Sequence, residues 1–235
     1  MTAARPLNVW ITRAQPGADA TAARVRALGH EPFVAPLLTV RPLPDVKIDL
    51  SGVRALAFTS ANGLRAFAEA CPDRSLRVFA VGAATAQAAR DAGFQRVLSA
   101  DGDVDALAEG IAARRAEIGG AVLHPGAAEP AGDLAGALAR VKIEVRTLTL
   151  YDTVPVRLTD RQLARLSEMD VVLAHSPKAA KALAAVLRAS PQPQLRVLAL
   201  SKAVLKPLAR AQVAARASAP FPLEAAMLNL IDRAS

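Results

Sequence analysis

The fold is decided by one stretch, RALAFTSANGLRAFAEACPDRSLRVFAVGAATAQAA, residues 54–89. It contains the same pattern twice: a short apolar run, a loop of small or hydroxylic residues, and an Ala-rich stretch. The apolar runs are residues 55–58 and 77–81. Short apolar runs bounded by turn signals are typical of buried strands, and the Ala-rich stretches are typical of helices. This alternation predicts an α/β fold with parallel sheets and helices on their faces.

The alternation extends toward the N-terminus. Residues 9–12 predict a strand, and residues 18–28 predict a helix that Gly29 closes. Residues 32–40 then predict a long extended segment. The Pro-rich run at 41–44 predicts a linker, because proline cannot continue a helix or a central strand.

The chain also repeats itself over a longer distance. Three short segments recur in the same order, 113, 116 and 119 residues later along the sequence. Each match is weak, but three in one order predict a duplicated α/β unit, A-B-A′-B′. The matching pairs are residues 28–32 with 141–145, residues 58–61 with 174–177, and residues 77–82 with 196–201.

This order permits two domain pairings: A with B and A′ with B′, or A with B′ and B with A′. The extended segments that end A and A′ have about ten residues each, roughly 33 Å at the rise of a strand, long enough to leave one domain and enter the other. We therefore expect the exchanged pairing: two similar doubly wound parallel-sheet domains joined by a two-stranded antiparallel linker. The expected boundaries are 1–38 with 155–235 for one domain, 39–154 for the other, and crossing segments at about 37–44 and 149–156.

Composition excludes several classes of protein. A hydrophobic fraction of 52% with 21% charged residues in 235 residues predicts a globular chain with real cores. No apolar run approaches the length of a membrane span, and residues 1–6 lack a secretory apolar core, so we expect a cytoplasmic protein. The single cysteine, Cys71, rules out an internal disulfide, and with three histidines it cannot form a Cys-rich zinc site. We expect Cys71 to be structural.

The net charge of +8, with a pI near 10.5, fits a nucleic acid, an anionic membrane surface or a polyanionic small molecule. The basic residues are spread through the chain, and 3% aromatic residues leave few platforms for stacking bases. This favours an acidic small-molecule substrate, with no membrane partner and no specific nucleic-acid partner. No loop has the spacing of a Walker phosphate loop or of the three-glycine dinucleotide fingerprint, so nucleotide cofactors are not indicated.

The loops after the predicted strands share one design. Each passes from a strand end through small or hydroxylic residues to a helix start, where free N–H groups and the helix dipole favour carboxylates or phosphates. Such loops gather at the carboxyl edge of a parallel sheet. The alternative is that their Ser, Thr and Asn side chains only cap helices. The loops are residues 59–62, 82–85, 125–128, 176–177 and 201–203.

Three single residues are further candidates. Tyr151, the only tyrosine, ends the second extended segment and could donate a proton or a hydrogen bond, although a half-buried packing role is the alternative. Arg13 follows the first strand and could receive a substrate carboxylate, with a solvated arginine as the alternative. Lys202 opposes the dipole at a helix start, which indicates either a nearby anion or simple exposure.

The histidines indicate no metal site. His30, His124 and His175 are far apart, and none forms a helix-spaced pair. His124 and His175 each end a predicted strand, so each could face a cleft, but we expect a solvated or capping role for both. No Ser-His-Asp or Cys-His constellation follows from the spacing.

The assembled pattern resembles the uroporphyrinogen-III synthase family over nearly the whole chain. The order of its motifs and the duplication carry the resemblance, because no single motif is decisive. The motifs are Val9-Trp10-Ile11-Thr12-Arg13, Phe58-Thr59-Ser60-Ala61, Val81-Gly82-Ala83-Ala84-Thr85-Ala86, Leu150-Tyr151, His175-Ser176-Pro177 and Ser218-Ala219-Pro220.

The resemblance implies a monomeric lyase of tetrapyrrole (haem) biosynthesis with two α/β domains and its substrate in the cleft between them. The reaction would be cyclisation of hydroxymethylbilane, a linear tetrapyrrole polycarboxylate, without cofactor or metal. Loss of the hydroxyl would give an azafulvenium cation. Attack by ring D would give a spiro-pyrrolenine, and its rearrangement would invert ring D to give uroporphyrinogen III and water.

The resemblance also implies roles for residues. Tyr151 would protonate the departing hydroxyl or orient it. Eight residues would bind the substrate carboxylates: Thr59, Ser60, Gly82, Ala83, Thr85, Ser176, Ser201 and Lys202. The strand ends and loops described above add four further substrate-binding candidates: Arg13, Ala61, Pro125 and Gly126.

The chain departs from the family pattern at three places in its second half. Ser201-Lys202-Ala203-Val204 replaces a Gly-Pro-Thr-like loop, His175 stands where threonine is common, and residues 127–129 replace a more basic or polar stretch. Two other classes of function stay open at this point: a non-catalytic two-domain binding or sensor protein for a polycarboxylate, and a nucleic-acid-binding regulator.

Overall fold

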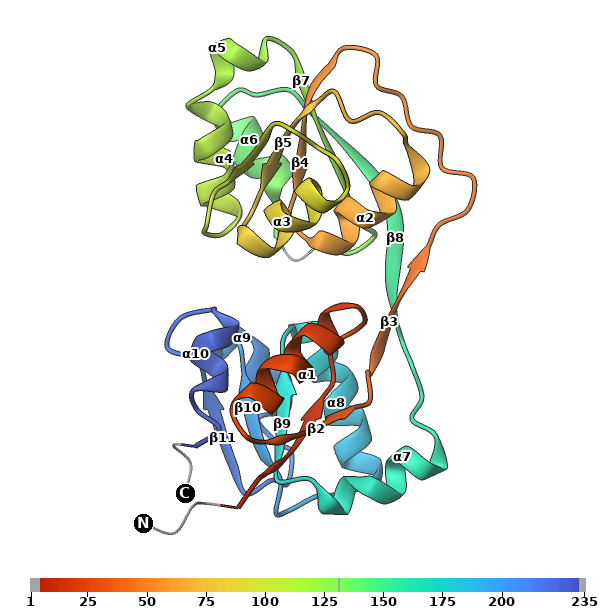
Figure 1. Cartoon of the computed structure of the whole chain (residues 1–235), viewed down its shortest axis with the longest axis vertical. Helices are drawn as coiled ribbons and strands as arrows, with labels where there is room; N and C mark the ends of the chain where they lie inside the picture. Colours follow the sequence, from red (N-terminus) through yellow and green to blue (C-terminus); the bar gives the residue numbers. More distant parts are fainter. Residues whose placement is uncertain (1–4, 131, 233–235) are drawn as a thin grey trace. The chain divides into compact units, whose positions relative to one another are not determined.

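The structure is a computed structural model that describes residues 5–130 and 132–232 (Figure 1). The chain forms two compact units. Unit 1 contains the chain up to Thr39 and again from Val154, and unit 2 is Val40–Thr153. The chain passes between the units twice, in strand β3 (Leu38–Pro42) and in strand β8 (Val145–Pro155).

Unit 1 is built on a five-stranded parallel sheet with the order β11-β10-β9-β1-β2. Its strands are β1 (Asn8–Ile11), β2 (Glu31–Val34), β9 (Val171–Ala174), β10 (Arg196–Ala199) and β11 (Ala215–Ser218). Its α-helices are α1 (Gly17–Ala27), α7 (Asp160–Ala164), α8 (Pro177–Ala189), α9 (Lys202–Leu205) and α10 (Glu224–Leu228), with 3-10 turns η1 (Arg165–Glu168) and η2 (Lys206–Leu208).

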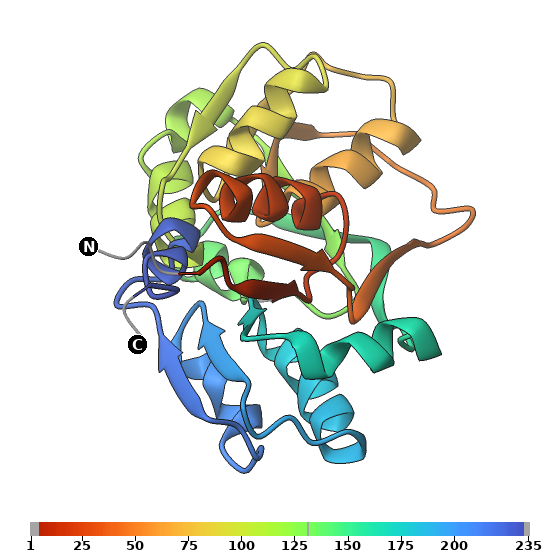
Figure 2. The same ribbon diagram turned by 60° about the horizontal axis from the view of Figure 1, so that its bottom comes forward.

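Side chains alternate along each strand between the two faces of this sheet, and both faces are buried. Val9 and Ile11 of β1 pack in one cluster with Val25 of α1 and residues of α10. Trp10, between them, packs in another cluster with Leu183 of α8. Helices therefore cover both faces, and Figure 2 shows α1 lying across β1 and β2.

Unit 2 is built on a six-stranded sheet with the order β3-β8-β7-β4-β5-β6, in which β4 to β8 are parallel. The remaining strands are β4 (Val53–Phe58), β5 (Arg77–Ala80), β6 (Val97–Ser99) and β7 (Ala121–Ala127). The helices are α2 (Ala61–Ala70), α3 (Ala83–Asp91), α4 (Val104–Ala112), α5 (Arg115–Ile118) and α6 (Leu134–Arg140). Phe58 and Phe67 pack edge to face in the cluster under α2 and α3, and Phe79 packs with α4 and α6 on the other face.

The first extended segment differs from the prediction. It is two strands, β2 and β3, separated at residues 35–37, and the predicted linker residues 41–42 belong to β3. Pro36, which has no N–H group, lies at the break, while Ala35 and Leu37 donate to the carbonyls of Ile11 and Thr12. Pro42 is tolerated because β3 is an edge strand. The second segment is one eleven-residue strand, β8.

Strands β3 and β8 run antiparallel. The N–H of Leu43 donates to the carbonyl of Leu150 at 2.8 Å, and the N–H of Val156 donates to the carbonyl of Leu37 at 2.9 Å. Higher numbers on one strand therefore face lower numbers on the other. No helix within residues 5–130 and 132–232 has the length and apolar character of a membrane span.

Candidate functional site

The strand order marks one special point in each sheet. In open α/β sheets, ligands bind at the carboxyl ends of the strands where the order reverses direction. In unit 2 the chain proceeds from β4 through β5 to β6 on one side and through β7 to β8 on the other, so the reversal lies between β4 and β7. In unit 1 it lies between β1 and β9. The candidate residues can be judged by their distance from these two points.

In unit 2 the structure brings together two predicted residues, Tyr151 and Ser60, that are 91 positions apart. The hydroxyl oxygens are 2.9 Å apart. Ser60 follows β4 as the N-cap of α2, and its Oγ also accepts the N–H of Gly63 at 3.1 Å. That bond leaves the Ser60 O–H free to donate to Tyr151, and the phenolic O–H is then free to donate to a ligand.

A β-bulge sets the direction of Tyr151. Strand β8 pairs regularly with β7 up to Thr149 opposite Gly126, and then Tyr151, not Leu150, stands opposite Ala127. A bulge re-aims the side chains that follow it. Here Leu150 and Tyr151 are both buried and pack in the same cluster, under α2 and α3, whereas regular alternation would place them on opposite faces of the sheet.

The surroundings of Tyr151 hold its proton. Burial raises the pKa of the phenol above its ordinary value of 10, and the hydrogen bond with Ser60 acts in the opposite direction. The phenol is therefore fully protonated at neutral pH. It can donate a hydrogen bond there, or a proton to a group that is becoming strongly basic.

The neighbouring helix starts supply N–H groups. Helices α2 and α3 follow the adjacent strands β4 and β5 and contact each other. Thr59 and Ala61 flank Ser60 and are half-buried. Gly82 is the N-cap of α3, and a side chain built on it would meet open space, while Ala83 is exposed. The first-turn N–H groups of a helix have no intrahelical acceptor, so these two starts can bind carboxylates.

Thr85 does not share this access. Its side chain is 5% exposed, and its N–H donates to the carbonyl of Gly82 at 3.1 Å. The predicted binding residue is therefore largely buried, and little of its side chain can contact a ligand.

Pro125 and Gly126 are not in a loop, which corrects the prediction for residues 125–128. Both are buried within β7, and α6 starts only after its N-cap, Asp133. The pairing of β7 with β4 stops at Leu123, so on that side the missing N–H of Pro125 leaves no ladder bond open. The carbonyl of Pro125 instead lies under α2, where a side chain on Gly63 would approach it to 2.9 Å.

In unit 1, Ser176 and Ser201 follow the neighbouring strands β9 and β10 and are the N-caps of α8 and α9. The Oγ of Ser176 accepts the N–H of Ala179 at 3.1 Å, the same capping bond that Ser60 makes in unit 2. Lys202 is exposed in the first turn of α9, which has four residues. These loops place hydroxyl and N–H groups at the carboxyl edge of the unit 1 sheet.

Arg13 lies at the reversal point of unit 1, but it is already paired. Its Nη1 donates to Oε1 of Glu224 at 3.0 Å, and its side chain is 35% exposed. Burial, and then Arg24, lower the pKa of Arg13. The neighbouring Arg24 also pairs with Glu224, through Oε2. Arg13 therefore binds a carboxylate of the chain itself, that of Glu224, and a substrate carboxylate would have to share it. Glu224 was not predicted from the sequence.

His175 completes this cluster, and the predicted solvated or capping role is wrong for it. Its side chain is 9% exposed, and Nε2 lies 2.9 Å from Oε1 of Glu224. Burial, with Arg13 and Arg24 nearby, lowers the pKa of His175 to about 3, so the ring is neutral and donates from Nε2. Its Nδ1 is buried and has no hydrogen-bond partner within the described residues.

His124 is buried as well, which corrects the same prediction. It lies within β7, and its Nδ1 donates to the carbonyl of Ala57 at 2.9 Å, while burial lowers the pKa of the ring. His30 is buried between the N–H of Leu7 and Asp232. Cys71 is the buried C-cap of α2. Across residues 5–130 and 132–232, no three His, Cys, Asp or Glu side chains gather as a metal site would need.

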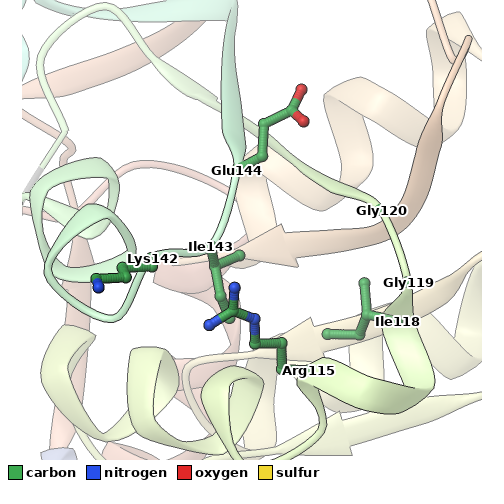
Figure 3. Close-up of a pocket in the computed structure, with 7 residues that line it drawn as sticks. All are labelled: Arg115, Ile118, Gly119, Gly120, Lys142, Ile143 and Glu144. Atoms are coloured by element: carbon green, nitrogen blue, oxygen red, sulfur yellow. The ribbon is translucent and has the colours of Figure 1, made fainter.

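A surface hollow of about 270 Å³ lies elsewhere in unit 2 (Figure 3). It is lined by residues 115, 118–120 and 142–144, which precede β7 and β8. Tyr151 stands beside Ala127 at the carboxyl end of β7. The hollow is therefore at the opposite edge of the sheet from the Tyr151–Ser60 pair and contributes nothing to it.

Comparisons with known proteins place the chain among relatives. A sequence model of a family described as uroporphyrinogen-III synthase HemD matches residues 19–229. A search of curated proteins finds no significant match. The crystal structure of uroporphyrinogen-III synthetase from Helicobacter pylori 26695 is similar over 99% of this chain and 100% of its own length, at 17% identity and a TM-score of 0.70.

A mutant uroporphyrinogen III synthase from the extremely thermophilic bacterium Thermus thermophilus is similar over 97% of this chain and 98% of its own, at 20% identity and a TM-score of 0.55. At these identities the structural likeness shows a common α/β fold with parallel sheets. The family match over residues 19–229 shows the family.

Proposed function

The chain belongs to the uroporphyrinogen-III synthase family, and we propose that Tyr151, oriented by Ser60, is the catalytic group through which it acts. The activity is the cyclisation of hydroxymethylbilane, a linear tetrapyrrole, to uroporphyrinogen III with inversion of ring D. The observation that carries the proposal is the 2.9 Å contact between the two hydroxyls at the reversal point of the unit 2 sheet.

The reaction needs one proton at its start. The hydroxymethyl group departs as water when its oxygen is protonated, and the pyrrole that carried it becomes an azafulvenium cation. The substituted carbon of ring D attacks this cation to form the spiro-pyrrolenine, which fragments and recloses with ring D inverted. Loss of a proton from the ring carbon restores the pyrrole, so the net products are uroporphyrinogen III and water.

Tyr151 suits the first and last of these steps. A buried phenol does not ionise spontaneously, but it can transfer its proton while the cation forms beside it, since the new positive charge stabilises the phenolate. The same oxygen then accepts the proton released at the end. The hydrogen bond from Ser60 holds the phenolic oxygen in place and stabilises its negative charge.

Positioning accounts for the rest of the catalysis. Hydroxymethylbilane cyclises without an enzyme, but then ring D is not inverted, so the protein must hold ring D for attack at its less accessible carbon. We propose that the helix starts of unit 2 (Thr59, Ser60, Ala61, Gly82 and Ala83) and of unit 1 (Ser176, Ser201 and Lys202) bind the substrate carboxylates. The net charge of +8 favours the approach of a polycarboxylate.

Two serines provide a matched test. Ser60→Ala and Ser176→Ala each remove one N-cap bond, at 3.1 Å in both cases, but only Ser60 also contacts Tyr151. Each variant should lose about 1 kcal/mol of stability. Turnover of hydroxymethylbilane should fall much further for Ser60→Ala, and equal turnover in the two variants would contradict the role of Ser60.

Several finer features are part of the same proposal. The enzyme is a hydro-lyase without cofactor or metal, a monomer, and cytoplasmic. Its two units act as domains joined by the β3–β8 pair, a reading that the antiparallel bonds at Leu43 and Val156 support. Sedimentation of the purified chain tests the monomer, and a dimer at micromolar concentration would contradict it. A non-catalytic sensor for a polycarboxylate is not favoured, because the family match is to a synthase.

A further inference from the structure

One aromatic side chain of this protein is not buried. The chain has six Phe, one Trp and one Tyr. Seven of these are at most 8% exposed, whereas Phe221 is 67% exposed. Leu223, two residues on, is 62% exposed. Two large apolar side chains that are close in the sequence are therefore both exposed to solvent. Contiguous exposed apolar patches are typical of binding sites, and this pair is the candidate for one in unit 1.

The backbone around Phe221 is stiff. Phe221 lies between Pro220 and Pro222, each of which fixes its own φ. The N–H of Leu223 donates to the carbonyl of Phe221 at 2.7 Å, which closes a tight turn. The turn connects the carboxyl end of β11 to α10 (Figure 1). It therefore lies at the carboxyl edge of the unit 1 sheet, on the same edge as Ser176 and Ser201.

Glu224 anchors this turn at its far end. The carboxylate is 14% exposed and pairs with Arg13 and Arg24. It also accepts the hydroxyl of Thr21 and the Nε2–H of His175. These four donors come from α1 and from the loops after β1 and β9, which meet at the reversal point of the sheet. A carboxylate bound by four donors fixes the position of the residues directly before it.

The anchor leaves positive charge beside the apolar turn. Two arginines share one carboxylate, and His175 is neutral, so the cluster carries a net charge of about +1. The Arg24 side chain is 56% exposed and that of Arg13 is 35% exposed, so this charge reaches solvent. A ligand that fits here has flat apolar rings and carries carboxylates.

We propose that Phe221 and Leu223 form a contact surface in unit 1 for the pyrrole rings of the linear tetrapyrrole substrate, and that Glu224 is the positioning residue that holds them. The inference rests on the proposed function, because that function supplies the ligand. A pyrrole offers an aromatic face to Phe221 and Leu223, and its acidic side chains reach Arg13 and Arg24.

The test compares Phe221→Ala with Leu28→Ala in steady-state turnover of hydroxymethylbilane. Leu28 is also exposed, at 41%, but it is the C-cap of α1, away from the carboxyl edge. Phe221→Ala should raise KM about tenfold, from the lost apolar contact, with little change in kcat or melting temperature. Leu28→Ala should leave KM and kcat unchanged. Glu224→Gln raises the charge of the cluster to about +2, which by itself would lower KM, so a rise in KM reports the loss of the anchored turn.

The outcomes separate this inference from the proposed function. If the wild-type chain makes uroporphyrinogen III and Phe221→Ala keeps the wild-type KM, the contact surface is wrong and the proposed function is unaffected. A wild-type chain that makes none contradicts the function itself, and the contact surface falls with it. A concentration-dependent dimer that Phe221→Ala dissociates, seen by sedimentation, also overturns the inference, because the turn would then contact a second copy of the chain.

Discussion

Replacing Tyr151 by phenylalanine removes one oxygen and tests the proposed proton donor. The ring is buried in the cluster that contains Phe58 and Leu64, so phenylalanine keeps the packing. The change breaks one hydrogen bond, the 2.9 Å contact with Ser60, whose Oγ keeps its bond to the N–H of Gly63. Loss of one such bond should lower the free energy of unfolding by about 1 kcal/mol.

The effect on turnover distinguishes two roles for the hydroxyl. General acid catalysis contributes roughly 10²- to 10⁴-fold, so kcat should fall at least about 100-fold if Tyr151 gives its proton to the departing hydroxyl. If Tyr151 only holds the substrate by one hydrogen bond of about 1 kcal/mol, the loss is about fivefold. Because the pKa of the phenol is raised, ionisation of this group should lower wild-type kcat only at a higher pH than for an ordinary phenol.

The assay quenches the reaction of hydroxymethylbilane at short times, oxidises the products and separates the porphyrin isomers. The spontaneous rate, measured without protein, is subtracted. Circular dichroism and thermal melting show whether the variant is folded. A folded Tyr151→Phe variant whose kcat falls about fivefold or less would refute the acid role and leave positioning as the mechanism.

Two further predictions concern stability. The pKa of His175 is about 3 in the folded chain and 6.5 ordinarily, so below pH 6.5 the unfolded chain binds a proton that the folded chain does not. The free energy of unfolding therefore decreases as the pH is lowered below 6.5. The free energy of unfolding of His175→Thr, measured in urea relative to wild type, should rise by about 2 kcal/mol as the pH is lowered from about 7.5 to 5. If the difference between the two proteins stays constant over this range, the ring is not neutral in the folded chain. Gly63→Ala places a Cβ 2.9 Å from the carbonyl of Pro125 and should cost about 1–3 kcal/mol in the same experiment, whereas an unchanged midpoint would show that α2 is not tightly packed there.

Much of the fold follows from local pattern. Short apolar runs such as residues 55–58 are strands in the structure, because each is too short for a helix and is bounded by turn signals. The break between β2 and β3 was not predicted, although Pro36 was the available signal. Pro125 and Gly126 were predicted to lie in a loop, because a Pro-Gly pair usually marks a turn. Only the register of β7 against its neighbours shows why they fit a strand.

The candidate site was predictable in its parts but not in its contacts. Tyr151 and Ser60 were both candidates, yet their pairing depends on the strand order of unit 2 and on a bulge that no sequence signal marks. Glu224 was missed because its four partners are 49 to 211 positions away. The one available signal was an acidic residue directly after the apolar run of residues 219–223.

The isomer composition of the product shows whether this chain inverts ring D. Purified wild-type chain is incubated with hydroxymethylbilane, and the oxidised porphyrins are compared with those of a protein-free control. Uroporphyrin III should predominate with the chain present, because only a protein that controls ring D can invert it. Type I porphyrin alone, formed at the rate of the protein-free control, would mean that the chain is not a uroporphyrinogen-III synthase.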